Sequence, residues 1–281
     1  AAHAVSYSLG RGDELQFGGR AGPGRGRRRA DVEVAGSPMM HAFSLTDDHV
    51  VIYDLPVSFN LAAGTNFPYA WDPSYPARVG VMGRDSDGSD VRWLDVEPCY
   101  VYHPLNAYDD GADRIVLDVV RHPKMFDADR HGPNDGAPTL DRWTVDLLAG
   151  KVIEERLDDR GQEFPRIDER LTGRRHRYGY SAAVSNDESI DFTAALLRHD
   201  LVSGRTESRS FGPAAHVGEF VFVPSGPDAA EDDGVVMGLV HRDDTGKTDL
   251  EVLDASTLET VASIHLPARV PYGFHGNWVP A

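Results

Sequence analysis

The chain has 281 residues, 41% of them hydrophobic, and its 45 acidic against 28 basic side chains give a formal charge of −17. That charge disfavours a nucleic-acid partner, and no apolar run approaches the length of a membrane-spanning helix. The single cysteine, Cys99, excludes an internal disulfide framework and, with no recognisable signal peptide, predicts a cytoplasmic location. Because Ala1 leads directly into a strand-like segment, we expect an N-terminal portion of the protein to precede this chain.

Runs of β-branched and aromatic residues predict strands through the first half, at residues 5–9, 13–17, 50–55, 78–82, 91–96, 100–103 and 114–120. Turn-forming residues in DSDGSD predict a hairpin between the fourth and fifth of these. The glycine- and arginine-rich stretch 18–30 could bind an anion or RNA. On so acidic a chain, however, a hairpin turn is the favoured interpretation.

The second half contains a repeat. TVDLLAGKVIEERL, HDLVSGRTESRSF and VLDASTLETVASIHL each place an aspartate between two strand-like runs, and these residues, Asp146, Asp200 and Asp254, are 54 positions apart. A period near 50 with strand–turn–strand units is typical of β-propeller blades. Only residues 185–197 leave helix and strand both open. We therefore predict an all-β chain, residues 1–281 forming an incomplete propeller of about five blades.

Three histidines interrupt apolar, strand-like or glycine-flanked segments: His41 in SPMMHAF, His103 in CYVYHPLNAY and His275 in PYGFHGNW. Such surroundings suit a buried metal ligand better than a solvated imidazole. The repeat would serve as the scaffold that brings them together.

Five segments in order resemble the carotenoid cleavage oxygenases, non-haem iron dioxygenases that include apocarotenoid and stilbene cleavers. They are GSPMMHAFSLTDDHVVIYDLP, YVYHPLNAYDD, GQEFPRID, GEFVFVPSGPDAAEDDGVV and PYGFHGNW. The resemblance implies a seven-bladed propeller with Fe(II) held by four histidines, of which His41, His103 and His275 are three. The first would lie before Ala1, and His3, the only candidate replacement, sits closer to His41 than the family pattern suggests.

The resemblance also implies carboxylates that orient the ligand rings, here Glu163 and Glu219, with a third in the absent N-terminal part. Each lies alone among apolar neighbours, which favours burial over surface exposure. Four aromatic side chains beside the ligands could line a substrate tunnel, although ordinary core packing is the commoner role; they are Phe43, Phe164, Phe274 and Trp278.

Other features have simpler interpretations. Six histidines in polar segments are expected to be solvated: His49, His122, His131, His176, His199 and His241. His216 could face the interior without being a ligand, and the acidic stretch 231–234 is expected to be a charged turn. Ala42 stands where the family usually has an acidic residue, a change that would weaken the metal site without altering its ligands.

The leading hypothesis is an Fe(II)-dependent dioxygenase that splits a C=C bond of an apolar apocarotenoid or stilbene-like alkene with O₂ into two carbonyl products. The alternative is an inactive propeller that serves as a metal-binding or interaction scaffold, since three histidines also suit Zn(II). A Ca(II)-dependent lactonase is disfavoured because it would need oxygen ligands. Peripheral membrane contact for substrate uptake and, for an open ring of blades, self-association are further predictions.

Overall fold

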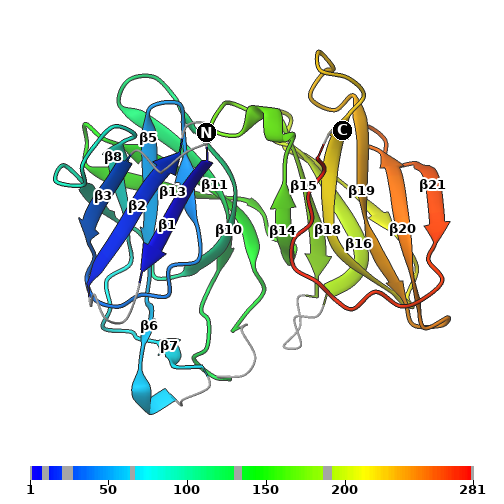
Figure 1. Ribbon diagram of the computed structural model, residues 1–281, viewed down its shortest axis with the longest axis horizontal. Helices are drawn as coiled ribbons and strands as arrows, with labels where there is room; N and C mark the ends of the chain where they lie inside the picture. Colours follow the sequence, from blue (N-terminus) through cyan, green and yellow to red (C-terminus); the bar gives the residue numbers. More distant parts are fainter. Residues whose placement is uncertain are drawn as a thin grey trace. The chain divides into compact units, whose positions relative to one another are not determined.

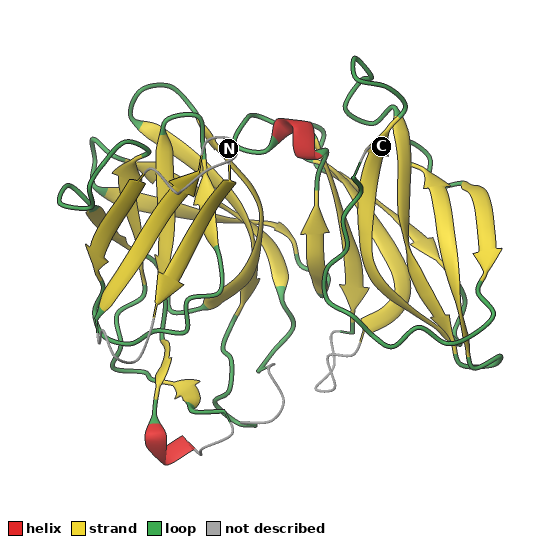
Figure 2. Ribbon diagram, in the orientation of Figure 1, coloured by secondary structure: helices red, strands yellow, loops and turns green. Residues whose placement is uncertain are grey.

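The computed structural model describes residues 2–7, 13–20, 28–63, 67–129, 135–185 and 192–279. Apart from two short 3-10 turns, η2 (Leu61–Ala63) and η3 (Glu169–Leu171), every regular element in these ranges is a β-strand (Figures 1 and 2). The described residues contain no helix long and apolar enough to cross a membrane. The predicted all-β class is confirmed.

The chain forms two compact units, the first comprising Ala1–Asp135 with Arg142–Glu155 and the second Gly136–Asp141 with Arg156–Ala281. The first unit contains a three-stranded sheet, a four-stranded sheet, a two-stranded hairpin and most of a second four-stranded sheet. In sheet order these strands are β1 (Ala2–Tyr7), β2 (Glu14–Arg20), β3 (Arg28–Glu33); β4 (Phe43–Leu45), β5 (His49–Asp54), β8 (Arg78–Gly83), β9 (Arg92–Asp95); β6 (Val57–Phe59), β7 (Tyr69–Trp71); and β10 (Tyr100–Asp109), β11 (Arg114–His122), β12 (Thr139–Asp146), β13 (Lys151–Asp158).

The second unit contains two more four-stranded sheets, each with its strands in sequence order. They are β14 (Gln162–Arg166), β15 (Tyr178–Val184), β16 (Phe192–Asp200), β17 (Arg205–Ser210) and β18 (Ala215–Pro224), β19 (Gly234–Arg242), β20 (Lys247–Asp254), β21 (Thr260–His265). All pairs given for these sheets are antiparallel. Each sheet is thus an up-and-down meander, the design of a propeller blade.

The 54-residue repeat corresponds to one such sheet. Asp146, Asp200 and Asp254 each end the third strand of a four-stranded sheet and begin the turn into the fourth. Their carboxylates accept backbone N–H groups of the turn, from Ala149 at 2.7 Å and from Val202 at 3.1 Å in the first two. Sequence period and structural repeat therefore coincide, while the total of about five blades stays a prediction.

The seven strands predicted in the first half are confirmed with shifted ends, whereas β3 and the three-residue strands β4, β6 and β7 were not predicted. Of the stretch 18–30, Gly18 and Gly19 pair with Arg29 and Arg28 at the adjoining ends of β2 and β3, as expected of a hairpin, and 21–27 lie outside the described residues. Residues 192–197 belong to β16, because cross-strand pairing with β15 and β17 outweighs their weak helical pattern.

Each unit has its own apolar core. In the first unit, one cluster surrounds fully buried Trp143 and another surrounds Leu15 and Phe17. In the second, Tyr180 and Phe220 are the largest fully buried side chains. These cores hold the sheets rigid and leave the irregular segments at the strand ends to carry the candidate site.

Candidate metal centre

The first strand of three successive sheets contains a β-bulge at a residue predicted for the site. In β10 the pairing register slips between Val101 and Pro104, so Tyr102 and His103 lie outside the regular ladder with β11. A bulge re-aims side chains and frees backbone groups for other partners. Pro104, which lacks an N–H, is typical of such an interruption.

His41 and His103 lie side by side in the first unit. Their ring centroids are 5.2 Å apart and their planes are nearly perpendicular, at 85°. Nδ1 of His41 lies 3.0 Å from the backbone carbonyl oxygen of Tyr102, one of the two bulged residues. Because a carbonyl oxygen only accepts, Nδ1 of His41 must donate, and in the neutral ring Nε2 keeps the lone pair that a metal would need.

In the second unit a bulge in β18, between Val217 and Phe220, contains Glu219. The side chain of Glu219 is only 4% exposed, and its Oε2 lies 3.0 Å from Nδ1 of His275. Its Oε1 accepts the N–H of Gly276 at 2.9 Å. An ionised carboxylate only accepts, so Nδ1 of His275 donates and Nε2 of the neutral ring remains available.

The bulge in β14 lies between Glu163 and Arg166. Within it Phe164 has φ of 53°, a left-handed conformation that costs a non-glycine residue roughly 1–2 kcal/mol. The N–H of Phe164 donates to Oε2 of Glu163 at 2.6 Å, and its ring lies edge-on to His275, 5.6 Å between centroids. Glu163 is buried, as predicted, and its role toward the metal stays a prediction.

A cavity of about 410 Å³ lies in the second unit against β18 and β19. Phe164, Phe274 and Trp278, three of the four aromatic residues predicted to line a tunnel, line it together with His275. Phe43 instead packs in the first unit, 5.9 Å from the ring of Phe17, in the core role that the sequence left open.

The three predicted ligands differ in exposure. His103 is half-buried, whereas His41 is exposed and the side chain of His275 is 48% exposed. The prediction of burial is therefore wrong for His41 and His275, because both lie in irregular segments, one before β4 and the other after β21, rather than in a sheet.

His3, the candidate fourth ligand, lies in β1. Its ring stacks on Phe17 with centroids 5.7 Å apart, and its Nε2 accepts a hydrogen bond from the guanidinium of Arg84 at 2.9 Å. Burial, together with the charge of Arg84, lowers the pKa of His3. Arg84 thus engages the Nε2 lone pair, which a metal coordinating at that nitrogen would require.

Four histidines expected to be solvated are buried, so that prediction is wrong: His122, His176, His199 and His241. Two of them show the reason. Nδ1 of His199 lies 2.9 Å from Oγ1 of Thr206, its cross-strand partner, and Nδ1 of His241 lies 3.0 Å from Oγ1 of Thr248, also directly opposite. Strand pairing supplies these partners, and the local sequence does not reveal them.

The other histidines are placed differently. His49 is half-buried with Nδ1 2.7 Å from Asp109, and His216 is half-buried with Nε2 2.7 Å from Asp243. His131 lies outside the described residues. Each pair engages one nitrogen of its imidazole, and the interpretation of His216 as a non-ligand stays a prediction.

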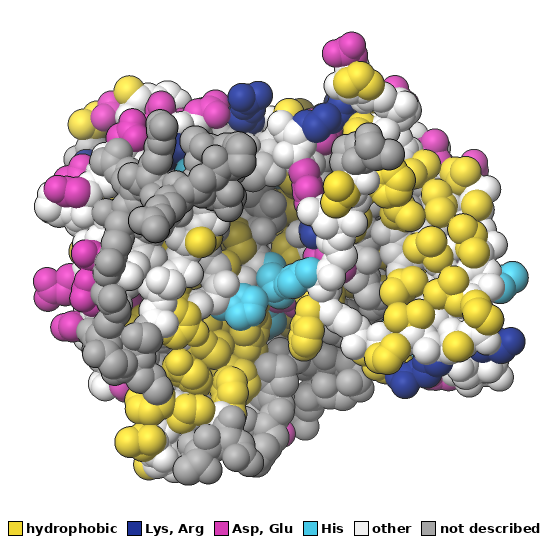
Figure 3. Space-filling model, in the orientation of Figure 1, with side chains coloured by type: hydrophobic (Ala, Val, Ile, Leu, Met, Phe, Trp, Pro, Cys, Tyr) yellow, Lys and Arg dark blue, Asp and Glu magenta, His cyan; other side chains and the backbone are white. Residues whose placement is uncertain are grey.

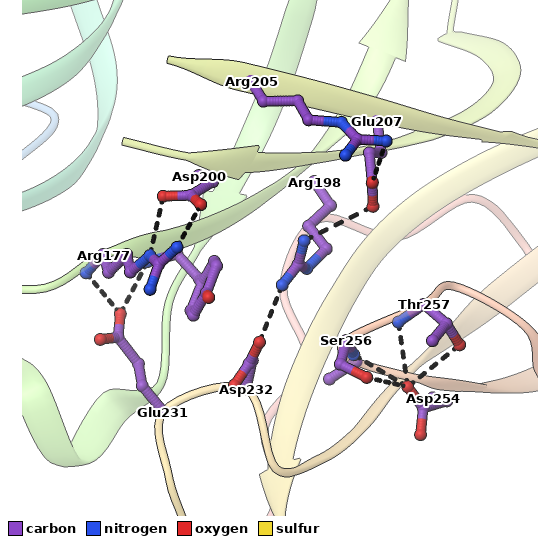
Figure 4. A network of polar contacts seen from close by, with 12 residues as sticks. Arg177, Arg198, Asp200, Arg205, Glu207, Glu231, Asp232, Asp254, Ser256 and Thr257 are labelled. Carbon is purple, nitrogen blue, oxygen red and sulfur yellow. Dashed lines mark hydrogen bonds and ion pairs between the residues drawn. The ribbon is translucent and has the colours of Figure 1, made fainter. Parts of the chain in front are cut away.

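The acidic stretch 231–234 forms the predicted turn but also anchors it (Figure 4). Oε1 of Glu231 accepts the N–H groups of Arg177 and Tyr178, at 2.6 and 2.7 Å. Asp232 pairs with Arg198 of β16 at 2.8 Å. Burial raises the pKa of Glu231. These contacts tie the loop between β18 and β19 to the neighbouring sheet, which is a structural role.

Within the described ranges, no group of three or more His, Cys, Asp or Glu side chains has the spacing of a metal site. What each unit provides is the donor chemistry: the pair His41 and His103 in one, and His275 with its carboxylate partner in the other. Neutral imidazoles whose second nitrogen is fixed by an acceptor suit Fe(II). The residues present therefore fit a histidine-held iron.

Fold and site together define an all-β protein of blade-like sheets in which His41 and His275 each direct Nδ1 to an acceptor. The chain belongs to the family described as retinal pigment epithelial membrane protein, which it matches over residues 3–280. The predicted resemblance to carotenoid cleavage oxygenases is confirmed by relatives of that name. One, from Mycobacterium tuberculosis strain H37Rv, is 47% identical across 99% of this chain and 65% of the relative.

One further relative and two solved structures agree with this family assignment. The apocarotenoid-15,15'-oxygenase of Synechocystis is 30% identical across 86% of this chain and 52% of that protein. The crystal structure of cobalt-substituted Synechocystis ACO matches with a TM-score of 0.88 and 26% identity, covering 99% of this chain and 60% of the other. A lignostilbene dioxygenase from Pseudomonas brassicacearum matches at 0.87 and 26%, covering 96% and 61%. The chain thus spans between about half and two thirds of these relatives.

Proposed function

We propose that this chain is the larger part of an Fe(II)-dependent dioxygenase that cleaves a C=C bond of an apocarotenoid or stilbene-like substrate with O₂ to give two carbonyl products. The observation that carries the proposal is the orientation of the histidines. His41 and His275 each direct Nδ1 to an acceptor within their own unit, which leaves Nε2 as the nitrogen that would bind the metal. His103 lies beside His41.

His41, His103 and His275 would hold the metal, with a further ligand from sequence not present in this chain. Iron, when bound, supplies the redox centre at which O₂ reacts with the alkene. Within this chain, Glu219 holds the ring of His275 through Nδ1, and the carbonyl of Tyr102 does the same for His41. Glu163 is proposed to orient a ligand in the same way from β14. Fixed rings keep the metal's geometry and open positions reproducible.

The substrate is proposed to be an extended, apolar alkene. Phe164, Phe274 and Trp278 surround a predominantly apolar cavity beside His275, which suits a hydrocarbon or an aromatic ring. The relatives are named for apocarotenoid, carotenoid and lignostilbene substrates, so the proposal covers both chemical classes.

Peripheral membrane contact is proposed for uptake of so insoluble a substrate. Side chains around the β6–β7 hairpin are apolar and exposed, Leu61 by 72% and Phe67 by 40%, and hydrophobic side chains gather over that part of the first unit (Figure 3). An exposed apolar patch of this kind is typical of a surface that meets lipid or another protein.

The first test is metal content by mass spectrometry after anaerobic reconstitution with Fe(II), on the wild type, His103→Ala and His216→Ala. We expect close to one iron per chain in the wild type and an at least tenfold lower iron content in His103→Ala, because loss of a ligand removes a donor that no neighbour replaces. His216→Ala is the matched control, because it removes an imidazole that also pairs with a carboxylate, Asp243, but lies outside the proposed ligand set; it should leave iron binding unchanged.

Iron retained by His103→Ala would refute the assigned ligand set. Absence of iron from every protein, the wild type included, would refute the proposal for this chain and favour the alternative of a metal-independent interaction scaffold. Stoichiometric iron in the wild type would justify measuring O₂ uptake with apocarotenals and hydroxystilbenes.

A further inference from the structure

We propose that Arg166 is a positioning residue that fixes the C-terminal segment, residues 266–279, and thereby the metal-ligating nitrogen of His275. The metal side of this inference rests on the proposed function, whereas the placement of the segment does not. Arg166 ends β14, and the segment follows β21, so that Arg166 and Gly276 are 110 positions apart in sequence.

The C-terminal segment has no regular structure of its own, yet it runs back across the sheet to lie beside β14 and β18 (Figure 1). Without a ladder, a segment is held only by individual contacts. Near its start Val270 donates its N–H to Oγ1 of Thr248 at 3.0 Å. Around His275 itself, hydrogen bonds from His275 and Gly276 go to Glu219, and Arg166 donates to Gly276 and Asn277. Oδ1 of Asn277 also accepts the N–H of Trp278, at 2.9 Å.

Arg166 makes that pair into a clamp. Its Nη1 donates to Oε1 of Glu219 at 3.0 Å and to the carbonyl oxygen of Gly276 at 3.3 Å. Its Nη2 pairs with Glu169 and lies 3.4 Å from Oδ1 of Asn277. A single planar guanidinium therefore holds both the carboxylate that orients His275 and the backbone that follows it.

The contact between Arg166 and Glu219 is largely buried, unlike an ion pair at the protein surface. The side chains of Arg166 and Glu219 are 16% and 4% exposed, so the charge-assisted hydrogen bond between them is weakly screened. A carboxylate buried to that degree needs a fixed cationic partner, and the half-exposed His275 does not supply a permanent charge. The guanidinium, which is always charged, meets that need and leaves Glu219 free to accept from His275 and Gly276.

The test is amide hydrogen exchange of the C-terminal peptide by mass spectrometry, without metal, on the full chain as wild type, Arg166→Met, Arg166→Lys and Arg170→Met. In Arg166→Met we expect exchange at residues 275–277 to accelerate about 10- to 100-fold, the factor for losing a hydrogen bond to a charged group. Arg166→Lys keeps the positive charge but loses the planar guanidinium with its several N–H donors, so its exchange rate at residues 275–277 should be intermediate.

Arg170→Met is the matched control because Arg170 makes the same kinds of bond elsewhere. Its guanidinium pairs with Asp168 and donates to carbonyl oxygens of the turn after β18, among them that of Pro227 at 2.9 Å. Its loss should accelerate exchange in residues 225–233 and leave 275–277 at the wild-type rate. Should Arg166→Met fail to fold, as judged by circular dichroism, Arg166→Lys is compared with the wild type and Arg170→Met instead.

A second measurement, of Co(II) binding, tests whether the position of the C-terminal segment affects the metal site. Titration with Co(II), followed by its visible absorption, should show about tenfold weaker binding and an altered spectrum in Arg166→Met, with partial recovery in Arg166→Lys. Unchanged exchange at 275–277 in both Arg166 variants would overturn the inference whatever the metal does. Accelerated exchange in a chain whose wild type binds no Co(II) would uphold the placement of the segment while refuting the proposed function.

Discussion

His199 shows how a buried titratable group couples the second unit to pH. Its side chain is 2% exposed and lies between Thr206 and Ser181, with ring nitrogens 2.9 and 3.3 Å from their hydroxyl oxygens. Burial lowers the pKa of His199 to about 4, against 6.5 as the ordinary value; nearby Arg160 acts in the same direction and Asp158 opposes it. The folded protein therefore holds this ring neutral.

Because the folded pKa lies below the unfolded one, the contribution of neutral His199 is complete above pH 6.5 and declines as the pH falls toward 4. The decline amounts to roughly 3 kcal/mol, as an upper value. We expect the urea midpoint of the wild type to drop between pH 7 and pH 4.5 by more than that of His199→Gln, which cannot titrate. Parallel pH profiles for the two proteins would show that this ring titrates normally in the fold.

At this scale the sequence identified the residues that belong to distinctive motifs and missed those whose role depends on pairing. His275 and Glu219 could be assigned because each stands alone among apolar neighbours in a segment shared with the family. Arg166 could not, since its partner lies 53 positions away and nothing near it in sequence indicates the contact. The burial of His199 and His241 was missed for the same reason.

Among the elements, the repeated feature is the bulge in the first strand of three sheets, β10, β14 and β18. The strands themselves followed from alternation of residue types. A bulge depends on the register with the next strand, which a single strand does not encode. Pro104, Pro165 and Gly218 lie at the three interruptions, and such residues inside a strand pattern are the available sequence signal.

The turns that begin with Asp146, Asp200 and Asp254 should contribute measurably to the stability of their sheets. Oδ1 of Asp254 accepts the N–H groups of Ser256 and Thr257, both at 3.0 Å, and the hydroxyl of Ser256 at 2.7 Å. We expect Asp254→Ala to destabilise the protein by about 1–2 kcal/mol, measured as a lower urea midpoint. Ser256→Ala, which removes only one of these bonds, is the control, and an equal loss in the two variants would contradict the role given to Asp254.

Across the whole molecule, the feature that bears on association is the outer edge of the last sheet, which pairs with no other strand in the described part of the chain. β21 is outermost in its sheet and exposed along its full length, with Val261 at 61% and Ile264 at 50%. An exposed strand edge with apolar side chains is a template for pairing with another copy. The predicted self-association therefore has a physical location in the second unit.

Sedimentation velocity over a range of concentrations tests this location. We expect the wild type to form concentration-dependent oligomers and Val261→Lys/Ile264→Lys to shift at least tenfold toward monomer, because charges on an edge strand oppose pairing. Val202→Lys, at a turn residue that is 75% exposed, controls for an added charge. A wild type that is monomeric throughout, or a double variant that associates equally, would contradict the prediction.

The position of His275 after the last strand has a consequence for the order in which the protein matures. Arg166 and Glu219 come from the first strands of two different sheets, so both sheets must have assembled before their clamp exists. Only then can residues 275–277 find their partners. His275 thus docks onto a finished surface. If His275 is a ligand, as proposed, a half-folded chain, whether newly synthesised or recovering from stress, would lack this oriented donor and would not capture a metal there prematurely.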